Sequence, residues 1–150
     1  MQISPETQLF IRKHQSDDIR ALALQAKKYP NVDMPTAITQ IAGRQVAVEK
    51  IPSWKEIEDI WYPKHLSLEQ CSSEITARYK ASLLQGESLT DLTAGFGIDC
   101  SFLASNFKSA TYVERQEELC EIATHNFPLL HLNHITVRNE DGIAYLQAMS

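Results

Sequence analysis

Glycines and acids are concentrated in residues 91–99, which run DLTAGFGID. Leucines on both sides of Asp91 predict the end of a strand, and Ala94, Gly95 and Gly97 let a backbone approach a ligand without Cβ collisions. An acid at Asp99 suits the first turn of a following helix. The stretch therefore predicts a strand-to-helix turn that binds a nucleotide cofactor. A turn whose glycines serve only steric needs is the alternative.

Strands and helices alternate from this turn onward. The hydrophobic pattern predicts strands at 88–92, 108–114 and 135–138, and helices at 99–104, 116–127 with an end at Pro128, and from 143. Strict alternation implies parallel strands joined by right-handed crossovers. The expected fold class is therefore α/β, with half of a doubly wound, Rossmann-like sheet of strand order 3-2-1.

Acids follow all three predicted strands, at Asp91, Glu114 and Asp141. Ligands of such sheets bind outside the carboxyl ends of the strands. The Glu114 carboxylate can accept two hydrogen bonds from a ribose diol, and Asp141 can accept one from an adenine amine while the Gly142 amide faces a ring nitrogen. Asp91 suits the ammonium of a methionine tail better than a pyrophosphate. The pattern therefore favours S-adenosylmethionine (SAM) as the cofactor.

Two alternatives from other classes stay open. An NAD-binding half-domain fits Gly95-x-Gly97 and the acid at Glu114, but a third glycine is missing and Asp91 would repel a pyrophosphate. A non-catalytic helical interaction module with a vestigial nucleotide-binding half is the other. A P-loop is excluded, because no Gly-Lys-Ser/Thr occurs.

The first part of the chain predicts helices. They begin at Ser4-Pro5, at Ser16 with an end at Pro30, at Asp33, at the capping box Ser53–Glu56, and at Ser67 with one long helix reaching residue 84. The expected domains are a helical domain at 1–86 and a partial SAM-binding domain at 87–150. Both tryptophans are expected in the core. Polar residues of the last helix could face a ligand site or solvent: Gln70, Ser73, Thr76 and Lys80.

Composition limits the function classes. The 150 residues carry a net charge of −5, with +1 on residues 1–86 and −6 on residues 87–150. The acidic second part does not attract phosphate backbones by itself. Neither a signal peptide nor a membrane span is predicted, so the expected location is cytoplasmic. Cys71, Cys100 and Cys120 lack metal or disulfide spacing, and the histidines do not form a metal pair, so no metal site is expected.

The motifs resemble those of a known family. Residues 91–97, Val113-Glu114 and Glu140-Asp141-Gly142 resemble the first three motifs of class I SAM-dependent methyltransferases, with Thr93 in place of a glycine as in a ribosomal-RNA guanine methyltransferase branch. The segment from Glu69 to Lys80 is similar to bacterial methyltransferases with a THUMP-like domain. The resemblance implies SAM-binding roles for a set of ten residues: Asp91, Thr93, Ala94, Gly95, Phe96, Gly97, Asp99, Glu114, Asp141 and Gly142.

The resemblance also implies what is missing. Family members continue into an Asn/Asp-Pro-Pro-aromatic motif that holds the target nitrogen, and no Pro-Pro occurs in this sequence. We therefore expect an inactive amino-terminal fragment of a longer enzyme, with a cofactor site and no catalytic residue of its own. The methyl acceptor implied by the family is a nucleic-acid base, in RNA. The strand at 88–92 would have one unpaired edge, which predicts self-association.

Overall fold

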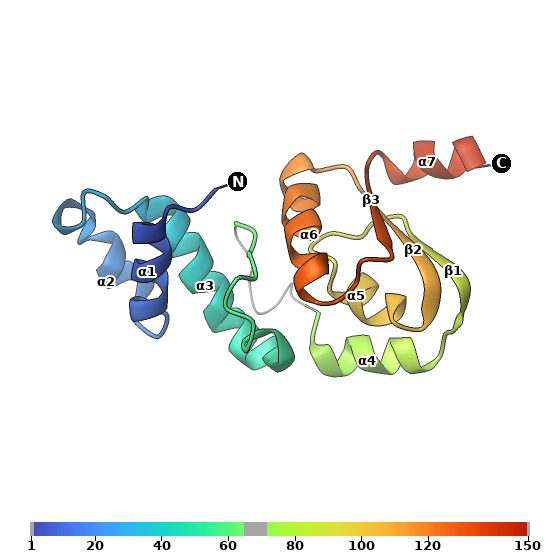
Figure 1. Ribbon diagram of the computed structural model, residues 1–150, viewed down its shortest axis with the longest axis horizontal. Helices are drawn as coiled ribbons and strands as arrows, with labels where there is room; N and C mark the ends of the chain where they lie inside the picture. Colours follow the sequence, from blue (N-terminus) through green and yellow to red (C-terminus); the bar gives the residue numbers. More distant parts are fainter. Residues whose placement is uncertain (1, 65–71, 150) are drawn as a thin grey trace. The chain divides into compact units, whose positions relative to one another are not determined.

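The computed structural model describes residues 2–64 and 72–149. Their contacts form two compact units (Figure 1): a helical unit of residues 2–56 and 62–64, and a unit of residues 57–61 and 72–149 that contains the sheet. The domains 1–86 and 87–150 stay a prediction. The compact units differ from that boundary because α4 (Glu74–Ser82) packs against α5 (Ile98–Ala104), beside the sheet.

The helical unit contains α1 (Pro5–His14), α2 (Ile19–Ala23), α3 (Met34–Lys50) and the 3-10 turns Ala26–Lys28 and Pro52–Trp54. Side-chain caps set two helix starts, since Ser4 accepts from the amide of Thr7 and Asp33 from that of Thr36. These starts confirm the prediction. Apolar residues of the three helices form the core: Phe10, Ile11, Leu22, Met34, Ala37 and Ile41.

Two helices of this unit were predicted wrongly. Asp18, not Ser16, caps α2, and the helix ends at Ala23 well before Pro30. The predicted capping box at Ser53–Glu56 starts no α-helix. The chain forms only the 3-10 turn Pro52–Trp54 there. A short helix is marginal in water without tertiary packing, and the turn already buries Trp54. Packing of that indole therefore decides the local structure.

The second unit holds a three-stranded parallel sheet of order β1-β2-β3. Its strands and remaining helices are β1 (Gly86–Asp91), β2 (Phe107–Glu114), α6 (Glu117–Leu129), β3 (Ile135–Asn139) and α7 (Gly142–Met149). The α/β class and the predicted strand order are confirmed. Pro128 does not break α6, which ends one residue later at Leu129. A proline in the last turn of a helix disturbs few backbone hydrogen bonds, because little of the helix follows it.

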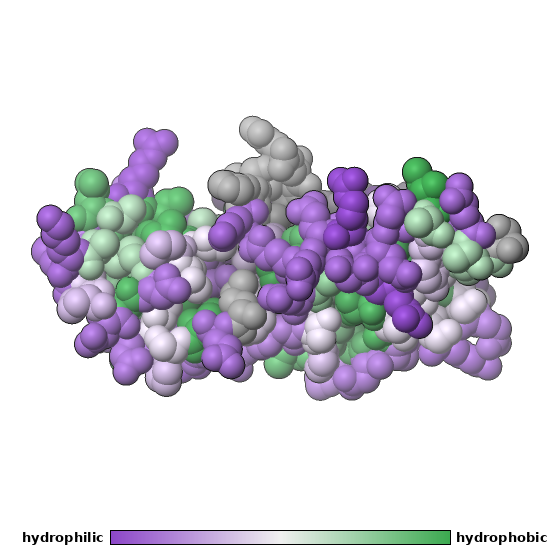
Figure 2. Space-filling model, turned by 90° about the horizontal axis from the view of Figure 1, so that it is seen from above, coloured by the Kyte–Doolittle hydropathy of each residue, from purple (hydrophilic) through white to green (hydrophobic). Residues whose placement is uncertain are grey.

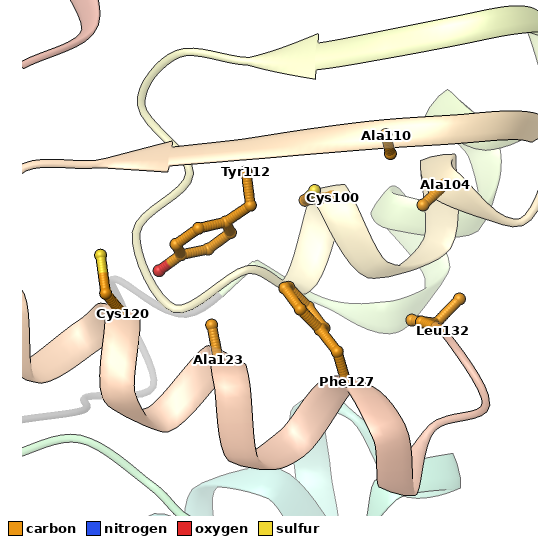
Figure 3. Close-up of a cluster of buried hydrophobic side chains, with 8 residues drawn as sticks. All are labelled: Cys100, Ala104, Ala110, Tyr112, Cys120, Ala123, Phe127 and Leu132. Atoms are coloured by element: carbon orange, nitrogen blue, oxygen red, sulfur yellow. The ribbon is translucent and has the colours of Figure 1, made fainter. Parts of the chain in front are cut away.

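Helices α5 and α6 pack on one face of β2 (Figure 3). The Tyr112 ring points from β2 toward both helices and meets Phe127 edge-on, at 5.5 Å between ring centroids. Cys100 and Ala104 of α5 and Cys120 of α6 complete the contact. Burial raises the pKa of both thiols, that of Cys100 to about 12. These two cysteines are core residues without thiolate character.

Helix α4 differs from the expected long helix. It begins at Glu74, capped by Ser73, while the predicted turns at 67–71 lie outside the described residues. Small residues face α5, with Ala77 fully buried, whereas the predicted apolar positions Ile75 and Tyr79 are 82% and 66% exposed. Alanines allow the helices to approach closely, which explains why the larger side chains point outward.

The segment 57–61 is fixed to α6. Asn126, almost fully buried, donates to the carbonyl of Trp61 and accepts from its amide, both at 2.9 Å. The indole of Trp61 stacks on His125 at 3.6 Å between ring centroids. Trp54 is buried as predicted, but Trp61 is only partly buried. The side-chain amide of Asn126 thus satisfies the backbone amide and carbonyl of Trp61, which a neighbouring strand would otherwise pair.

Apolar side chains are exposed on α7. Ile143, Leu146 and Met149 expose 71%, 54% and 59% of their surface. Figure 2 shows hydrophobic colour among hydrophilic side chains at the end of the molecule where α7 lies. Among the described residues, no helix is long and apolar enough to cross a membrane.

Candidate functional site

The loop between β1 and α5 has the conformation that its glycines predict. Gly95 and Gly97 adopt φ values of 57° and 91°, which residues with a Cβ rarely adopt. A Cβ on Gly97 would lie 3.2 Å from the Tyr112 ring, whereas no atom lies within 4 Å of the Cβ position at Gly95. Gly97 is therefore needed for packing, and Gly95 leaves one side of the loop open.

Glu114 ties this loop to the end of β2. One carboxylate oxygen accepts from the amide of Gly95 at 3.0 Å, and the other accepts from the amide of Gln116 at 2.8 Å. The residue is 9% exposed. Each carboxylate oxygen can accept a second hydrogen bond, so Glu114 can still bind a diol from the open side.

Tyr112 of β2 also binds the loop between β1 and α5. Its buried hydroxyl donates to the carbonyl of Gly95, so Tyr112 and Glu114 together bind both polar groups of that residue. Asn139, opposite Glu114 in the sheet, donates to the Glu114 carbonyl at 3.1 Å. Neither Tyr112 nor Asn139 was predicted as a site residue, because tertiary contacts alone give them these roles.

Asp141 fixes the third strand end. Its Oδ1 accepts from the amides of Ile143 and Ala144, both at 3.0 Å, and so caps α7. Next to it, Gly142 approaches the first loop so closely that a Cβ would lie 2.3 Å from the Leu92 carbonyl oxygen. Gly142 thus allows the loops after β1 and β3 to meet.

A cavity of about 430 Å³ opens at these strand ends. It is lined by Leu92, Thr93, Glu114, Arg115, Gln116, Asp141, Gly142, Ile143 and Leu146. Four of the ten predicted site residues are brought together there: Thr93, Glu114, Asp141 and Gly142. Asp91, Ala94, Gly95, Phe96, Gly97 and Asp99 do not line it. The sequence interpretation missed five lining residues, although each lies within five positions of a predicted acid: Leu92, Arg115, Gln116, Ile143 and Leu146.

Asp91 lies at the end of β1 beside further charged groups. Its carboxylate accepts from the amide of Thr93 at 3.2 Å. Burial raises the pKa of Asp91, and the charges of Asp99 and Glu114 raise it further, against the opposing effects of the Thr93 amide and Lys80. The ionised Asp91 carboxylate is therefore less stable in the folded chain than in water.

Replacing Asp91 with asparagine should raise the melting temperature at pH 7 by roughly 1–3 °C. Asparagine keeps an acceptor for the Thr93 amide and removes the unfavourable charge. Since the folded-state pKa is raised, the destabilisation is lost as the pH falls through that pKa, so the gain should shrink toward acidic pH. Thermal unfolding followed by circular dichroism measures this, with exposed Glu87→Gln as control. A lower melting temperature for Asp91→Asn at pH 7 would contradict it.

Metal chemistry has no support in the part of the chain that the structure describes. No group of three or more histidine, cysteine, aspartate or glutamate side chains there could hold an ion. The chemistry of the site is that of hydrogen-bond acceptors, backbone amides and an apolar wall.

Comparison with solved structures identifies the architecture. A protein from Porphyromonas gingivalis W83, provisionally named a methyltransferase, is 30% identical with a TM-score of 0.75 over 95% of this chain. The second unit has part of a Rossmann-like methyltransferase fold. The chain spans 36% of the length of that protein.

Two other solved structures are less similar. Trm5b from Pyrococcus abyssi is 21% identical over 48% of this chain and 23% of its own, with a TM-score of 0.44. Coclaurine N-methyltransferase, bound to N-methylheliamine and SAH, is 20% identical over 92% of this chain and 44% of its own, with a TM-score of 0.40. No protein-family model and no curated protein matches the chain.

Proposed function

We propose that the second unit binds SAM and forms the cofactor-binding part of a methyltransferase. The observation that carries the proposal is the cavity at the carboxyl ends of all three strands, with Glu114 and Asp141 in its wall. The P. gingivalis protein supports it, because its likeness covers nearly the whole of this chain.

The cavity fits an adenosine in size and chemistry. Its volume of about 430 Å³ lies within the roughly 300–1,000 Å³ of small-molecule pockets. We assign the ribose diol to Glu114 and the adenine to the space beside Asp141 and Gly142, with Ile143 and Leu146 against the ring. The methionine part would lie along Thr93–Gly97, where Gly95 is open.

In this proposal the chain binds and orients the cofactor. SAM supplies an electrophilic methyl group, and transfer is an in-line displacement by the acceptor. We propose a nucleic-acid base, in RNA, as the acceptor, on the resemblance of the motifs, and the cytoplasm as the location. No residue of this chain is assigned a catalytic role, since the Asn/Asp-Pro-Pro-aromatic motif does not occur in the sequence.

NAD fits the site less well. The Asp91 carboxylate accepts a hydrogen bond at the very start of the loop, so a partly buried negative charge lies where a pyrophosphate would bind. The Asp91 carboxylate and a pyrophosphate bound beside it are both negative, and they would repel each other strongly in a partly buried site. A helical interaction module without cofactor stays the alternative from another class.

Isothermal titration of the 150-residue chain with SAM, S-adenosylhomocysteine (SAH) and NAD tests the proposal. We expect SAM and SAH to bind and NAD to give no heat. Glu114→Ala should weaken SAH binding by at least tenfold, since it removes charged acceptors of the ribose.

Glu87→Ala is the matched control, because Glu87 is a 79% exposed glutamate at the opposite end of the sheet. It should bind SAH like the wild type. Tighter binding of NAD would favour a dinucleotide site, and no heat with any of the three compounds would favour the interaction module.

We further propose that the chain self-associates through β1. Among the described strands, β1 pairs only with β2, so one edge of β1 has no strand partner there. Unpaired strand edges template pairing with other chains. Size-exclusion chromatography with light scattering at rising concentration should show a mass above the 17.0 kDa of one chain. A monodisperse monomer at high concentration would contradict this.

A further inference from the structure

The outward face of α4 is apolar. Ile75, Tyr79 and Leu83 follow one another at four-residue spacing along one side of the helix, here called the α4 stripe, and are 82%, 66% and 64% exposed. Ala77 and Ala81 are buried and lie on the opposite side, toward α5. Surface helices usually turn their large apolar side chains to the core, whereas α4 turns its alanines there. Contiguous exposed apolar side chains of this kind are typical of an interaction surface.

The two cations that flank the α4 stripe are paired within the chain. Arg78 donates to Glu74 at 2.8 Å, and its guanidinium lies 5.0 Å from the centre of the Phe102 ring. Lys80, on the other side of the stripe, pairs with Asp99 at 3.1 Å. Nucleic acids bind chiefly to cations that neutralise phosphates, and here acids of the chain already neutralise both cations. The charges therefore favour an apolar partner surface over RNA.

The spacing of the α4 stripe makes it complementary to itself. Tyr79 lies midway between Ile75 and Leu83. In an antiparallel pair of α4 helices centred on Tyr79, the two tyrosine rings meet at a twofold axis, and Ile75 of each copy packs against Leu83 of the other. Twofold interfaces need such a patch, because each copy contributes the same surface. A second copy of this chain therefore fits the stripe in both chemistry and register.

We propose that two copies of the chain associate through the α4 stripe, as an antiparallel helix pair with twofold symmetry. None of the three stripe residues belongs to β1 or lines the cavity, so this contact is separate from the strand edge and from the proposed function. Three side chains on each copy bury less than the roughly 800 Å² per partner of stable complexes. The dimer is therefore weak and forms at high chain concentration.

Disulfide cross-linking tests the contact at the twofold axis. Tyr79→Cys places two thiols there, and a Cys71→Ser background leaves only the buried native thiols of Cys100 and Cys120. Under mild oxidation we expect a linked product of twice the 17.0 kDa of one chain. Lys108→Cys is the control, because it places an equally accessible thiol on β2, where the lysine side chain is 78% exposed. This control should stay a single chain.

A mixture of two cysteine variants tests the antiparallel direction. Ile75→Cys and Leu83→Cys chains should link to each other faster than either variant links to itself. In the antiparallel pair, the thiols of two chains of the same variant lie about 12 Å apart along the helix axis, since each position is four residues from the centre. Faster linking within each variant than in the mixture would contradict the antiparallel pair.

Sedimentation equilibrium of two Tyr79 variants measures how much this contact contributes to the dimer. Tyr79→Glu brings two carboxylates together at the twofold axis, so the dissociation constant should rise at least tenfold. Tyr79→Phe keeps the ring and should stay within threefold of the wild type. Circular dichroism checks that both variants are folded, as expected for a side chain that is largely exposed.

Other outcomes would overturn the α4 contact. If Tyr79→Cys does not link at concentrations at which the chain sediments above one copy, the association uses another surface, such as the edge of β1. A monomer at every concentration would overturn the α4 contact and the β1 contact together. A labelled oligouridine that binds the wild type and not Tyr79→Glu, with unchanged sedimentation, would make the stripe an RNA surface. SAH binding, measured separately, decides the cofactor proposal and depends on none of these outcomes.

Discussion

Replacing Gly142 with alanine should weaken SAH binding about 100-fold, the largest effect on binding that we expect from one methyl group. The added Cβ would lie 2.3 Å from the carbonyl oxygen of Leu92 and 3.2 Å from its carbonyl carbon. These are backbone atoms, so no side-chain rotation can relieve the contact. The loops after β1 and β3 must separate, and both line the cavity.

Isothermal titration with SAH measures the loss, and circular dichroism checks that the variant is folded. Gly86→Ala is the control, because Gly86 begins β1 at the other end of the sheet and its Cβ would meet only the side chain of Phe107. We expect Gly86→Ala to bind SAH within about twofold of wild type. Wild-type affinity in folded Gly142→Ala would mean that the two loops do not form the site together.

Truncating Tyr112 to alanine should lower the free energy of unfolding by about 3–5 kcal/mol, the cost of removing a large aromatic side chain from a core. The residue is fully buried between α5 and α6 (Figure 3) and packs against Phe127. Tyr112→Phe keeps the ring and should cost about 1–2 kcal/mol, since the Gly95 carbonyl loses its donor.

Urea unfolding measures both Tyr112 variants. Tyr79→Ala on α4 is the control, because this tyrosine is 66% exposed and should change stability by no more than about 0.5 kcal/mol. A Tyr112→Ala variant as stable as Tyr79→Ala would place Tyr112 outside the core. Tyr112→Phe should also weaken SAH binding, because the hydroxyl fixes the loop that the cofactor follows.

Local signals predicted the sheet well. Strand period, the alternation with helices and the glycine positions fixed three strands to within two residues, and the structure confirms their parallel order. The glycines were informative because Gly95 and Gly97 adopt positive φ. Each of these signals depends on a residue and its immediate neighbours, which a sequence contains in full.

Features set by tertiary contacts were not predicted. The side of α4 that is buried depends on Ala77 fitting against α5, which periodicity of large residues cannot show. The hydroxyl of Tyr112 finds its acceptor seventeen positions away in the chain. Of the predicted polar face, Lys80 does reach a site residue, Asp99, whereas Ser73 and Thr76 bond each other at the start of α4, and Gln70 lies outside the described residues.

A crystal structure of the chain with SAH tests the central claim most directly. We expect the adenine between Asp141 and Ile143, the ribose diol on the carboxylate of Glu114, and the amino-acid end along Thr93–Gly97. Crystals grown at saturating SAH whose cavity holds no ligand, or SAH bound away from the ends of β1, β2 and β3, would contradict the claim that these strand ends form a SAM site.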